Sequence, residues 1–139
     1  MKFLLQKEVV AMADVVVKKS KIHGMGAFAN RDFKSGEIVV KWNISHQLTA
    51  EEVEKLLKSE KRYVAFFKGK YILMQSPAKY VNHSCDANTH SDNFCDVANR
   101  NIMKGEEITA NYSETMALSE SMKCSCGSKN CRAVIKSEK

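Results

Sequence analysis

Proline and long apolar runs are scarce in this chain, and both shortages narrow the class of protein. The 139 residues include one Pro and six Gly, well below the share that marks low-complexity or disordered chains. The longest apolar stretch, Val9 to Val17, is interrupted by Asp14, whereas a membrane span needs about 20 apolar residues. With 44% hydrophobic and 27% charged residues, the composition predicts one globular domain with a buried core and no membrane segment.

The first residues also lack the features of a secretory signal. Only Phe3, Leu4 and Leu5 precede the polar Gln6, and this apolar region is too short for a signal peptide. We therefore expect an intracellular protein, in the cytoplasm or nucleus, that is not secreted. In a reducing compartment its five Cys residues are expected to be thiols or metal ligands rather than disulfides.

Arginine is scarce as well, although the chain is basic. There are 22 Lys and Arg against 16 Asp and Glu, a formal net charge of +6, and only four of the basic residues are Arg. Nucleic-acid readers typically cluster their basic residues on one face, whereas these are dispersed. The pattern argues against direct nucleic-acid binding and favours a solvated basic surface, with a zinc-dependent nucleic-acid binder as an open alternative.

What the chain does contain is a series of short β-strand patterns. β-branched and aromatic residues recur in short runs between turn residues, as is typical of strands. A helix is indicated by the capping box Thr49-Ala50-Glu51-Glu52 and by Val53, Leu56 and Leu57 at helical spacing. The sequence thus predicts a mostly β domain with one or two short helices. The expected strands are 15–17, 27–29, 38–42, 63–67, 71–74, 94–98 and 107–112, with a hairpin turn at 68–70.

The strongest chemical signal is a C-x-C-x4-C cluster formed by Cys124, Cys126 and Cys131. Three thiolates at this spacing can face one tetrahedral Zn²⁺, and Gly127 permits the tight turn between them. A closed structural site needs a fourth ligand. Cys85 and Cys95 are the only other cysteines, so the sequence predicts one structural zinc ion whose fourth ligand comes from another part of the chain.

Three further segments are ambiguous when each is considered alone. Residues 80–88 are dense in Asn, His, Ser and Asp side chains, which occur both in ordinary turns and in binding loops. Residues 104–112 resemble a turn followed by an alternating strand. His23-Gly24-Met25-Gly26 is no dinucleotide fingerprint, because the third glycine and the following helix are missing.

Taken in order, these segments resemble one family. A GxG turn at 24–26, Asn82-His83-Ser84-Cys85, GEEI followed by Tyr112, and the cysteine cluster together resemble the SET-domain protein lysine methyltransferases with a post-SET zinc cluster. The resemblance covers about residues 14 to 132. It implies a SET fold of small curved β-sheets with a C-terminal pseudoknot and a zinc-bound post-SET tail, in which 82–88 and 105–112 lie side by side.

The resemblance also divides the chain and implies an activity. It implies an N-terminal extension at 1–13, a SET domain at 14–116 and a post-SET segment with a short tail at 117–139. The implied reaction moves a methyl group from S-adenosylmethionine to the ε-amine of a lysine. The implied partner is a protein substrate that presents this lysine, such as a histone or another nucleic-acid-associated protein.

Individual residues inherit roles from the same resemblance. Tyr112 matches the catalytic tyrosine, which would orient the neutral lysine amine toward the methyl group and also contact the cofactor. Cys85 becomes the fourth zinc ligand beside Cys124, Cys126 and Cys131, and Cys95 is left as a core or free thiol. The cofactor-binding residues are expected to be His23, Gly24, Met25, Gly26, Asn82, His83 and Tyr112.

Some positions depart from the family pattern. Trp42 stands where the family commonly has a Tyr-x-Gly segment, so it is either a core residue or a wall of the lysine channel. Asn111 replaces an acidic residue, and Lys79 stands where an Arg is usual. These departures leave open a non-catalytic SET module that binds a peptide or protein partner. The resemblance admits a homodimer, but no residue predicts an interface, a substrate protein or a methylation state.

Overall fold

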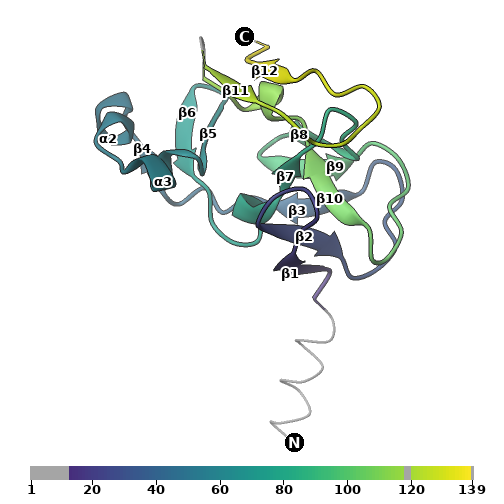
Figure 1. Ribbon diagram of the computed structural model, residues 1–139. Coiled ribbons are helices and arrows are strands. Elements are labelled where there is room, and N and C mark those ends of the chain that lie inside the picture. The colour runs from purple at the N-terminus through teal and green to yellow at the C-terminus, as the bar shows by residue number, and fades with distance from the viewer. Residues whose placement is uncertain (1–12, 118–119, 139) are drawn as a thin grey trace, which may run out of the picture.

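A computed structural model describes residues 13–117 and 120–138 of the chain. Within these residues, four small β-sheets and a few short helices surround one core (Figure 1). This arrangement confirms the predicted mostly β class. No helix in 13–117 or 120–138 has the length and apolar character that crossing a membrane requires.

The largest sheet joins distant parts of the sequence. Its strand order is β1-β2-β10-β7, and β10 runs antiparallel to β2 but parallel to β7. The pairing of Thr109 with Asn82 and of Ala110 with His83 brings 82–88 and 105–112 side by side, as the family resemblance implies. The strands are β1 (Val15–Lys19), β2 (Met25–Ala29), β7 (Asn82–His83) and β10 (Glu107–Ala110).

The middle of the sequence forms two three-stranded sheets. One has the order β3-β9-β8, with β3 (Ile38–Lys41), β8 (Thr89–Asp92) and β9 (Cys95–Ala98). The other has the order β4-β6-β5, with β4 (Gln47–Leu48), β5 (Val64–Phe67) and β6 (Lys70–Leu73). Lys68 and Gly69 both have positive φ, 50° and 74°, as a two-residue hairpin turn requires, so the predicted turn is confirmed.

The helical segment is shorter than its apolar spacing predicts. The predicted capping box is present, because Thr49 accepts from the Glu52 amide and Glu52 accepts from the Thr49 amide. However, α2 (Ala50–Glu54) ends before Leu57, which is extended, 69% exposed and precedes α3 (Lys58–Lys61). Leu57 therefore contributes nothing to a buried helical face, and only Val53 and Leu56 are half-buried.

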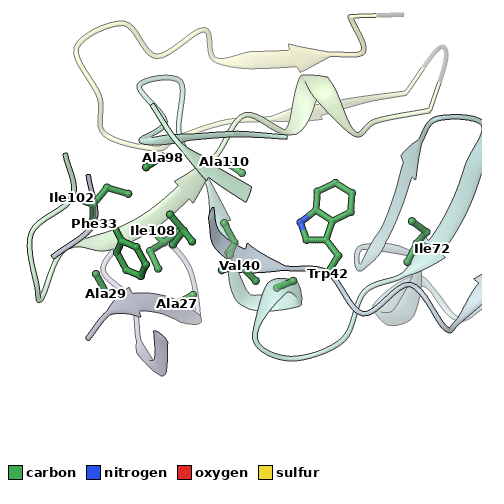
Figure 2. Close-up of a cluster of buried hydrophobic side chains, with 13 residues drawn as sticks. Ala27, Ala29, Phe33, Val40, Trp42, Ile72, Ala98, Ile102, Ile108 and Ala110 are labelled. Atoms are coloured by element: carbon green, nitrogen blue, oxygen red, sulfur yellow. The ribbon is translucent and has the colours of Figure 1, made fainter. Parts of the chain in front are cut away.

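The core packs small side chains against a few large ones (Figure 2). Ala27, Ile102 and Ile108 are fully buried, and Phe33 is 1% exposed. Trp42 is also buried and meets Phe67 and Phe94 edge-on at ring-centroid distances of 5.3 and 6.1 Å. The core interpretation of Trp42 is therefore correct, although the same side chain also borders the cavity described below.

Four short elements complete the described chain. The 3-10 helices η1 (Ala78–Tyr80) and η2 (Tyr112–Glu114) follow β6 and β10, respectively. The C-terminal hairpin pairs β11 (Ser121–Lys123) with β12 (Val134–Lys136) at the edge of the molecule, near the C-terminus in Figure 1. Ile135 is its one fully buried side chain, and the Glu138 amide donates to the Ser113 carbonyl.

Candidate functional site

A cavity of about 670 Å³ lies where the turn before β2, the η1–β7 segment, η2 and the C-terminal tail meet. Its walls combine apolar side chains with polar groups, as is typical of small-molecule sites. Gly26 does not border it. The sequence-predicted cofactor residues that do are His23, Gly24, Met25, Asn82, His83 and Tyr112.

The turn at 20–26 forms one rim of this cavity. Gly24 has a φ of +46°, a conformation that glycine adopts without strain, and its carbonyl accepts from the Ser20 amide. At Gly26, a side chain would collide with the Glu107 carboxylate and approach Ser20 Cβ to 3.0 Å. The space at Gly26 is therefore filled by protein atoms, and its place among the cofactor-binding residues stays a prediction.

Asn82 holds this rim in place from β7. Its Nδ2 donates to the carbonyls of His23 and Met25, at 3.0 and 3.1 Å, and to Glu107 Oε2 at 2.9 Å. The Glu107 carboxylate also accepts from the Ser20 hydroxyl at 2.8 Å. Sequence reasoning treated Glu107 as part of an ordinary strand, whereas it is the acceptor on which Asn82 and Ser20 converge.

His83, on β7, lies against Tyr112, which begins η2 just after β10; their ring centroids are 5.4 Å apart. The Tyr112 amide donates to His83 Nδ1 at 3.0 Å, so Nδ1 carries no proton. Burial, and secondly the positive charge of Arg132, lower the pKa of His83 to about 4. His83 is therefore a neutral imidazole at pH 7 with its proton on Nε2, which is 3.4 Å from Cys85 Sγ.

The Tyr112 hydroxyl is buried beside a backbone carbonyl. It donates to the Val81 oxygen at 2.6 Å. Burial, and secondly the Asp96 carboxylate, raise the pKa of Tyr112 well above its usual range. The hydroxyl therefore remains protonated at neutral pH, where it can orient a ligand but has no tendency to act as an anionic base.

Another wall of the cavity contains two cationic side chains, which the sequence analysis did not identify as a pair. Arg62 and Lys79 both border the cavity and lie over the Tyr63 ring, at 4.9 and 4.4 Å from its centroid. Arg62 also contacts His23 Nδ1 at 3.4 Å. The pair gives this wall a positive charge, which suits an anionic group on a ligand.

Four cysteines converge next to the cavity. The Sγ atoms of Cys85, Cys124, Cys126 and Cys131 all lie within 4.8 Å of one another. The Cys124 sulfur is 3.9 Å from that of Cys85 and 3.8 Å from that of Cys131, close to the roughly 3.8 Å edge of a tetrahedron with Zn–S of ~2.3 Å. The donor set therefore fits a tetrahedral zinc ion, while Cys95 lies outside the group on β9.

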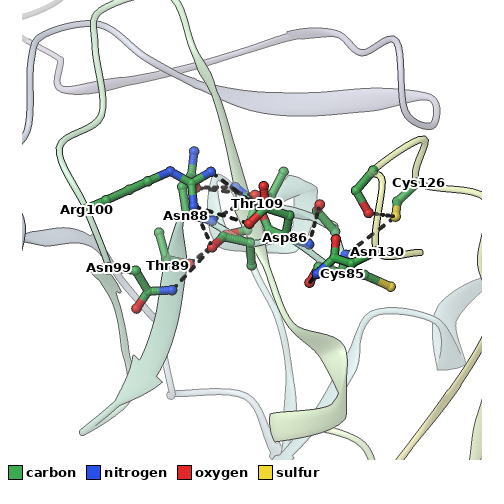
Figure 3. A network of polar contacts seen from close by, with 12 residues as sticks. Cys85, Asp86, Asn88, Thr89, Asn99, Arg100, Thr109, Cys126 and Asn130 are labelled. Carbon is green, nitrogen blue, oxygen red and sulfur yellow. Dashed lines mark hydrogen bonds and ion pairs between the residues drawn. The ribbon is translucent and has the colours of Figure 1, made fainter. Parts of the chain in front are cut away.

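Donors around Cys126 favour the thiolate form that a metal requires, whereas burial raises the pKa of Cys124 to about 12. Burial opposes ionisation of Cys126, yet the Cys85 amide and the Ser128 hydroxyl donate to its sulfur and lower its pKa to about 5. The Arg132 amide donates to Cys85 Sγ at 3.3 Å. These contacts and the Asn130 side chain, which donates to the Cys85 carbonyl at 3.1 Å, join the tail to the 82–88 loop (Figure 3).

Asn88 fixes the other end of that loop. Its Oδ1 accepts from the Thr109 amide and its Nδ2 donates to the Glu107 carbonyl, both at 2.9 Å. Thr89 adds a hydroxyl bond to the Thr109 carbonyl at 2.8 Å, and Figure 3 shows Asn88, Thr89 and Thr109 close together. Asn88 is 3% exposed, so the loop that carries Asn82, His83 and Cys85 is anchored by buried hydrogen bonds.

Known proteins resemble the chain over most of its length. Human histone-lysine N-methyltransferase 2D is 28% identical over 136 residues, 86% of this chain and 2% of that protein. Histone-lysine N-methyltransferase trithorax of Drosophila virilis is 30% identical over 143 residues, 87% of this chain and 4% of that protein. The Debaryomyces hansenii histone-lysine N-methyltransferase, H3 lysine-36 specific, is 29% identical over 142 residues, 86% of this chain and 19% of that protein.

The chain thus spans a small part of the length of these relatives. A family model, the SET domain, matches residues 24–113. The match includes the turn at Gly24, the 82–88 loop and Tyr112, and it covers more than half of the 139 residues. The chain therefore belongs to the SET-domain family, as its ordered motifs predict.

Proposed function

We propose that this protein is an S-adenosylmethionine-dependent protein lysine N-methyltransferase. The observation that carries the proposal is the arrangement of the Tyr112 hydroxyl. It is buried at a cavity that also borders His23, Met25 and Asn82. Membership of the SET-domain family and the names of the relatives support the same activity.

The proposed cofactor site is the rim formed by the turn at 23–26, Asn82 and His83. S-adenosylmethionine would supply an electrophilic methyl group on a sulfonium centre. The Met25 and His23 carbonyls are already oriented by Asn82, and a neutral His83 offers a flat surface without a charge. The cationic wall of Arg62 and Lys79 suits the carboxylate of such a ligand.

Tyr112 is the proposed catalytic residue. A lysine amine has a reference pKa of ~10.4 and attacks only when it is neutral. The cavity walls would remove water from the amine and lower its pKa, while the protonated Tyr112 hydroxyl and the Val81 carbonyl would orient its lone pair. Alignment of reacting atoms near ~3 Å supplies much of the acceleration in such reactions. No covalent intermediate on the enzyme is required.

The four cysteines are proposed to hold one structural zinc ion. Cys85 belongs to the proposed SET domain at 14–116, and the other three belong to the proposed post-SET segment at 117–139. Residues 120–126 border the cavity, so this metal would hold part of the cavity wall in position. The N-terminal extension proposed at 1–13 lies almost entirely outside the described residues.

The proposed substrate is a protein that presents a lysine, such as a histone. The names of the relatives support this class, and an intracellular location, nuclear for a histone substrate, follows from it. The decisive experiment incubates the zinc-loaded full chain with methyl-labelled S-adenosylmethionine and core histones. We expect label on lysine. No transfer to histones or to other basic proteins, with peptide binding intact, would favour the non-catalytic module instead.

Replacing Tyr112 by Phe tests the assigned role. We expect turnover to fall by about 10²-fold or more, with cofactor affinity changed by less than about threefold, because the hydroxyl acts mainly in the transition state. The measurements are steady-state methyl transfer and calorimetric titration with S-adenosylmethionine. Tyr71→Phe is the matched control, since Tyr71 lies on β6 and is not among the residues that border the cavity. An unchanged rate in the Tyr112 variant would remove it from catalysis.

A further inference from the structure

Asp96 is a buried acidic residue whose one effect described so far is on the pKa of Tyr112. It lies on β9, where Asp96 and Ala98 are buried and the intervening Val97 is half-buried. Asp96 is 3% exposed. Aspartate is rarely buried to this extent unless a partner compensates its charge, so its place on the inward face of a strand requires an explanation.

One partner of Asp96 is the Trp42 indole. Trp42 Nε1 donates to Asp96 Oδ2 at 3.1 Å, and the indole is fixed by edge-on contacts with Phe67 and Phe94. Figure 2 shows the Trp42 ring, with its nitrogen, standing apart from the alanine-rich part of the core. A neutral hydrogen bond of this kind leaves the negative charge of the carboxylate without a counter-ion.

The Asp96 carboxylate has unused acceptor capacity toward the cavity. A carboxylate offers about four lone-pair positions, and within 13–117 and 120–138 this side chain accepts one hydrogen bond, from Trp42. Asp96, Trp42 and Tyr112 all border the same cavity. A donor that enters this cavity meets Asp96 as one of its wall residues, and the Asp96 carboxylate acts electrostatically on Tyr112.

No positive charge of the described residues is paired with Asp96, although Arg62 and Lys79 border the same cavity. In the described residues, no Lys, Arg or His forms an ion pair with it, and its strand neighbours Val40 and Ser91 are uncharged. Burial, opposed by the Trp42 bond and assisted by the negative charge of Glu114, raises the pKa of Asp96 to about 7. A cationic ligand at this position would supply the missing compensation.

We infer that Asp96 binds the cationic amine end of the substrate side chain as it enters the cavity, before the amine loses the proton that it must lose to attack, and thereby selects an alkylammonium over a neutral group of the same size. This inference rests on the proposed function, since it names the residue that receives the lysine. Asp96 acts as a specificity residue, and Trp42 holds its carboxylate in position. The chemistry recognised is a primary alkylammonium on an unbranched chain.

The chain contains its own probe for this inference. Trp42 is the one tryptophan of the 139 residues, and its indole N–H is bonded to the Asp96 carboxylate, so its fluorescence reports on a ligand that binds there. The full zinc-loaded chain is titrated with n-butylammonium, which mimics the end of a lysine side chain. The neutral comparison ligand is 1-butanol, which has the same chain length.

Asp96→Asn is the informative variant, because it retains an oxygen that can accept from Trp42 and removes the negative charge. We expect saturable n-butylammonium binding in the wild type and at least tenfold weaker binding in the variant, with 1-butanol binding unchanged. Asp92→Asn is the matched control, since Asp92 is an exposed β8 residue that does not border the cavity. Its n-butylammonium affinity should equal that of the wild type.

Two results would overturn the inference. One is equal n-butylammonium affinity in the wild type and Asp96→Asn. The other is a wild type that binds 1-butanol as tightly as n-butylammonium, or that binds neither ligand. Because it uses the wild type alone, this second test decides the question even if the Asp96→Asn variant does not fold. The proposed function is tested separately, because methyl transfer by the wild type is measured without reference to the amine titration. Amine selectivity without methyl transfer would retain the Asp96 assignment and reject the enzyme.

Discussion

The body of the domain, residues 13–117, and its tail, residues 120–138, are held together by different means. In the body, buried side chains such as Asn82 and Asn88 bond directly to backbone groups of distant strands. In the tail, all three residues of β11 are exposed, and Ile135 is the fully buried residue of β12. The tail therefore has little apolar burial with which to maintain its position.

This difference identifies the cavity wall that the proposed zinc ion would stabilise. The rim at 23–26 and the Tyr112 wall follow from hydrogen bonds within the body. The wall at 120–126 belongs to a segment whose strongest potential link to the body is the four-sulfur group. Zinc binding to such a group is linked to folding of the segment that carries the ligands, so the two halves of one cavity should respond differently to the same perturbation.

The largest expected effect is loss of the tail on removal of a sulfur ligand. Cys85→Ser should lose zinc, because three thiolates do not close a structural site. Residues 120–138 should then become sensitive to protease, the body should stay folded, and methyl transfer should fall at least tenfold. Metal analysis by mass spectrometry and limited proteolysis measure these outcomes.

Cys95→Ser provides the control for this experiment. Cys95 lies on β9 outside the four-sulfur group, so its variant should keep one zinc per chain and the wild-type cleavage pattern. Full zinc occupancy in Cys85→Ser would move the fourth ligand elsewhere. If the body became sensitive to protease together with the tail, the two regions would fold as one unit.

The next largest effect is expected within the body, from Asn88→Ala. This change leaves the Thr109 amide and the Glu107 carbonyl without their buried partner, at a cost of about 2–3 kcal/mol. Urea unfolding measures the free energy. The exposed Asn99, whose Nδ2 donates to the Ala87 carbonyl at 3.3 Å, supplies the control: Asn99→Ala should cost less than about 1 kcal/mol. Equal costs would contradict the assigned anchor.

Local features of the body were predictable from sequence because short-range physics determines them. The hairpin at Lys68-Gly69 needs two positive φ angles, and the Thr49 capping box satisfies amides three residues apart. The end of α2 before Leu57 was not predictable from spacing. An apolar residue at helical spacing extends a helix only where there is a surface for it to contact, and Leu57 is exposed.

Long-range features required the family resemblance. The parallel pairing of β7 with β10 and the approach of Cys85 to cysteines about 40 residues away follow from no local pattern. Glu107, although part of the GEEI motif, and Asp96 received no role because each lies in a run that resembles an ordinary strand. Asp96 could have been noticed, because side chains alternate between the two faces of a strand. Asp96 lies on the same face of β9 as Ala98, and that face is buried, where a charge is costly.

The smallest expected effect is a pH dependence of stability. It arises from Asp96, a buried side chain of the body that is expected to destabilise the fold. The folded-state pKa of Asp96 is about 7 against an ordinary value of 3.8, so the folded protein binds this proton more tightly than the unfolded chain. Stability from this group therefore falls as the pH rises from about 4 to about 7. The neighbours that face it are Trp42, Tyr112 and Glu114, none of which is cationic.

Asp96→Asn should for this reason stabilise the protein at pH 8, by on the order of 1–2 kcal/mol, while the two proteins should be nearly equal at pH 4.5. Urea unfolding at the two pH values gives the comparison. If the difference in unfolding free energy between the wild type and Asp96→Asn is the same at both pH values, Asp96 is paired in the folded state. A gap confined to high pH would mean that the otherwise well-bonded body retains a destabilising buried charge, and a residue kept at a cost to stability is one expected to serve binding.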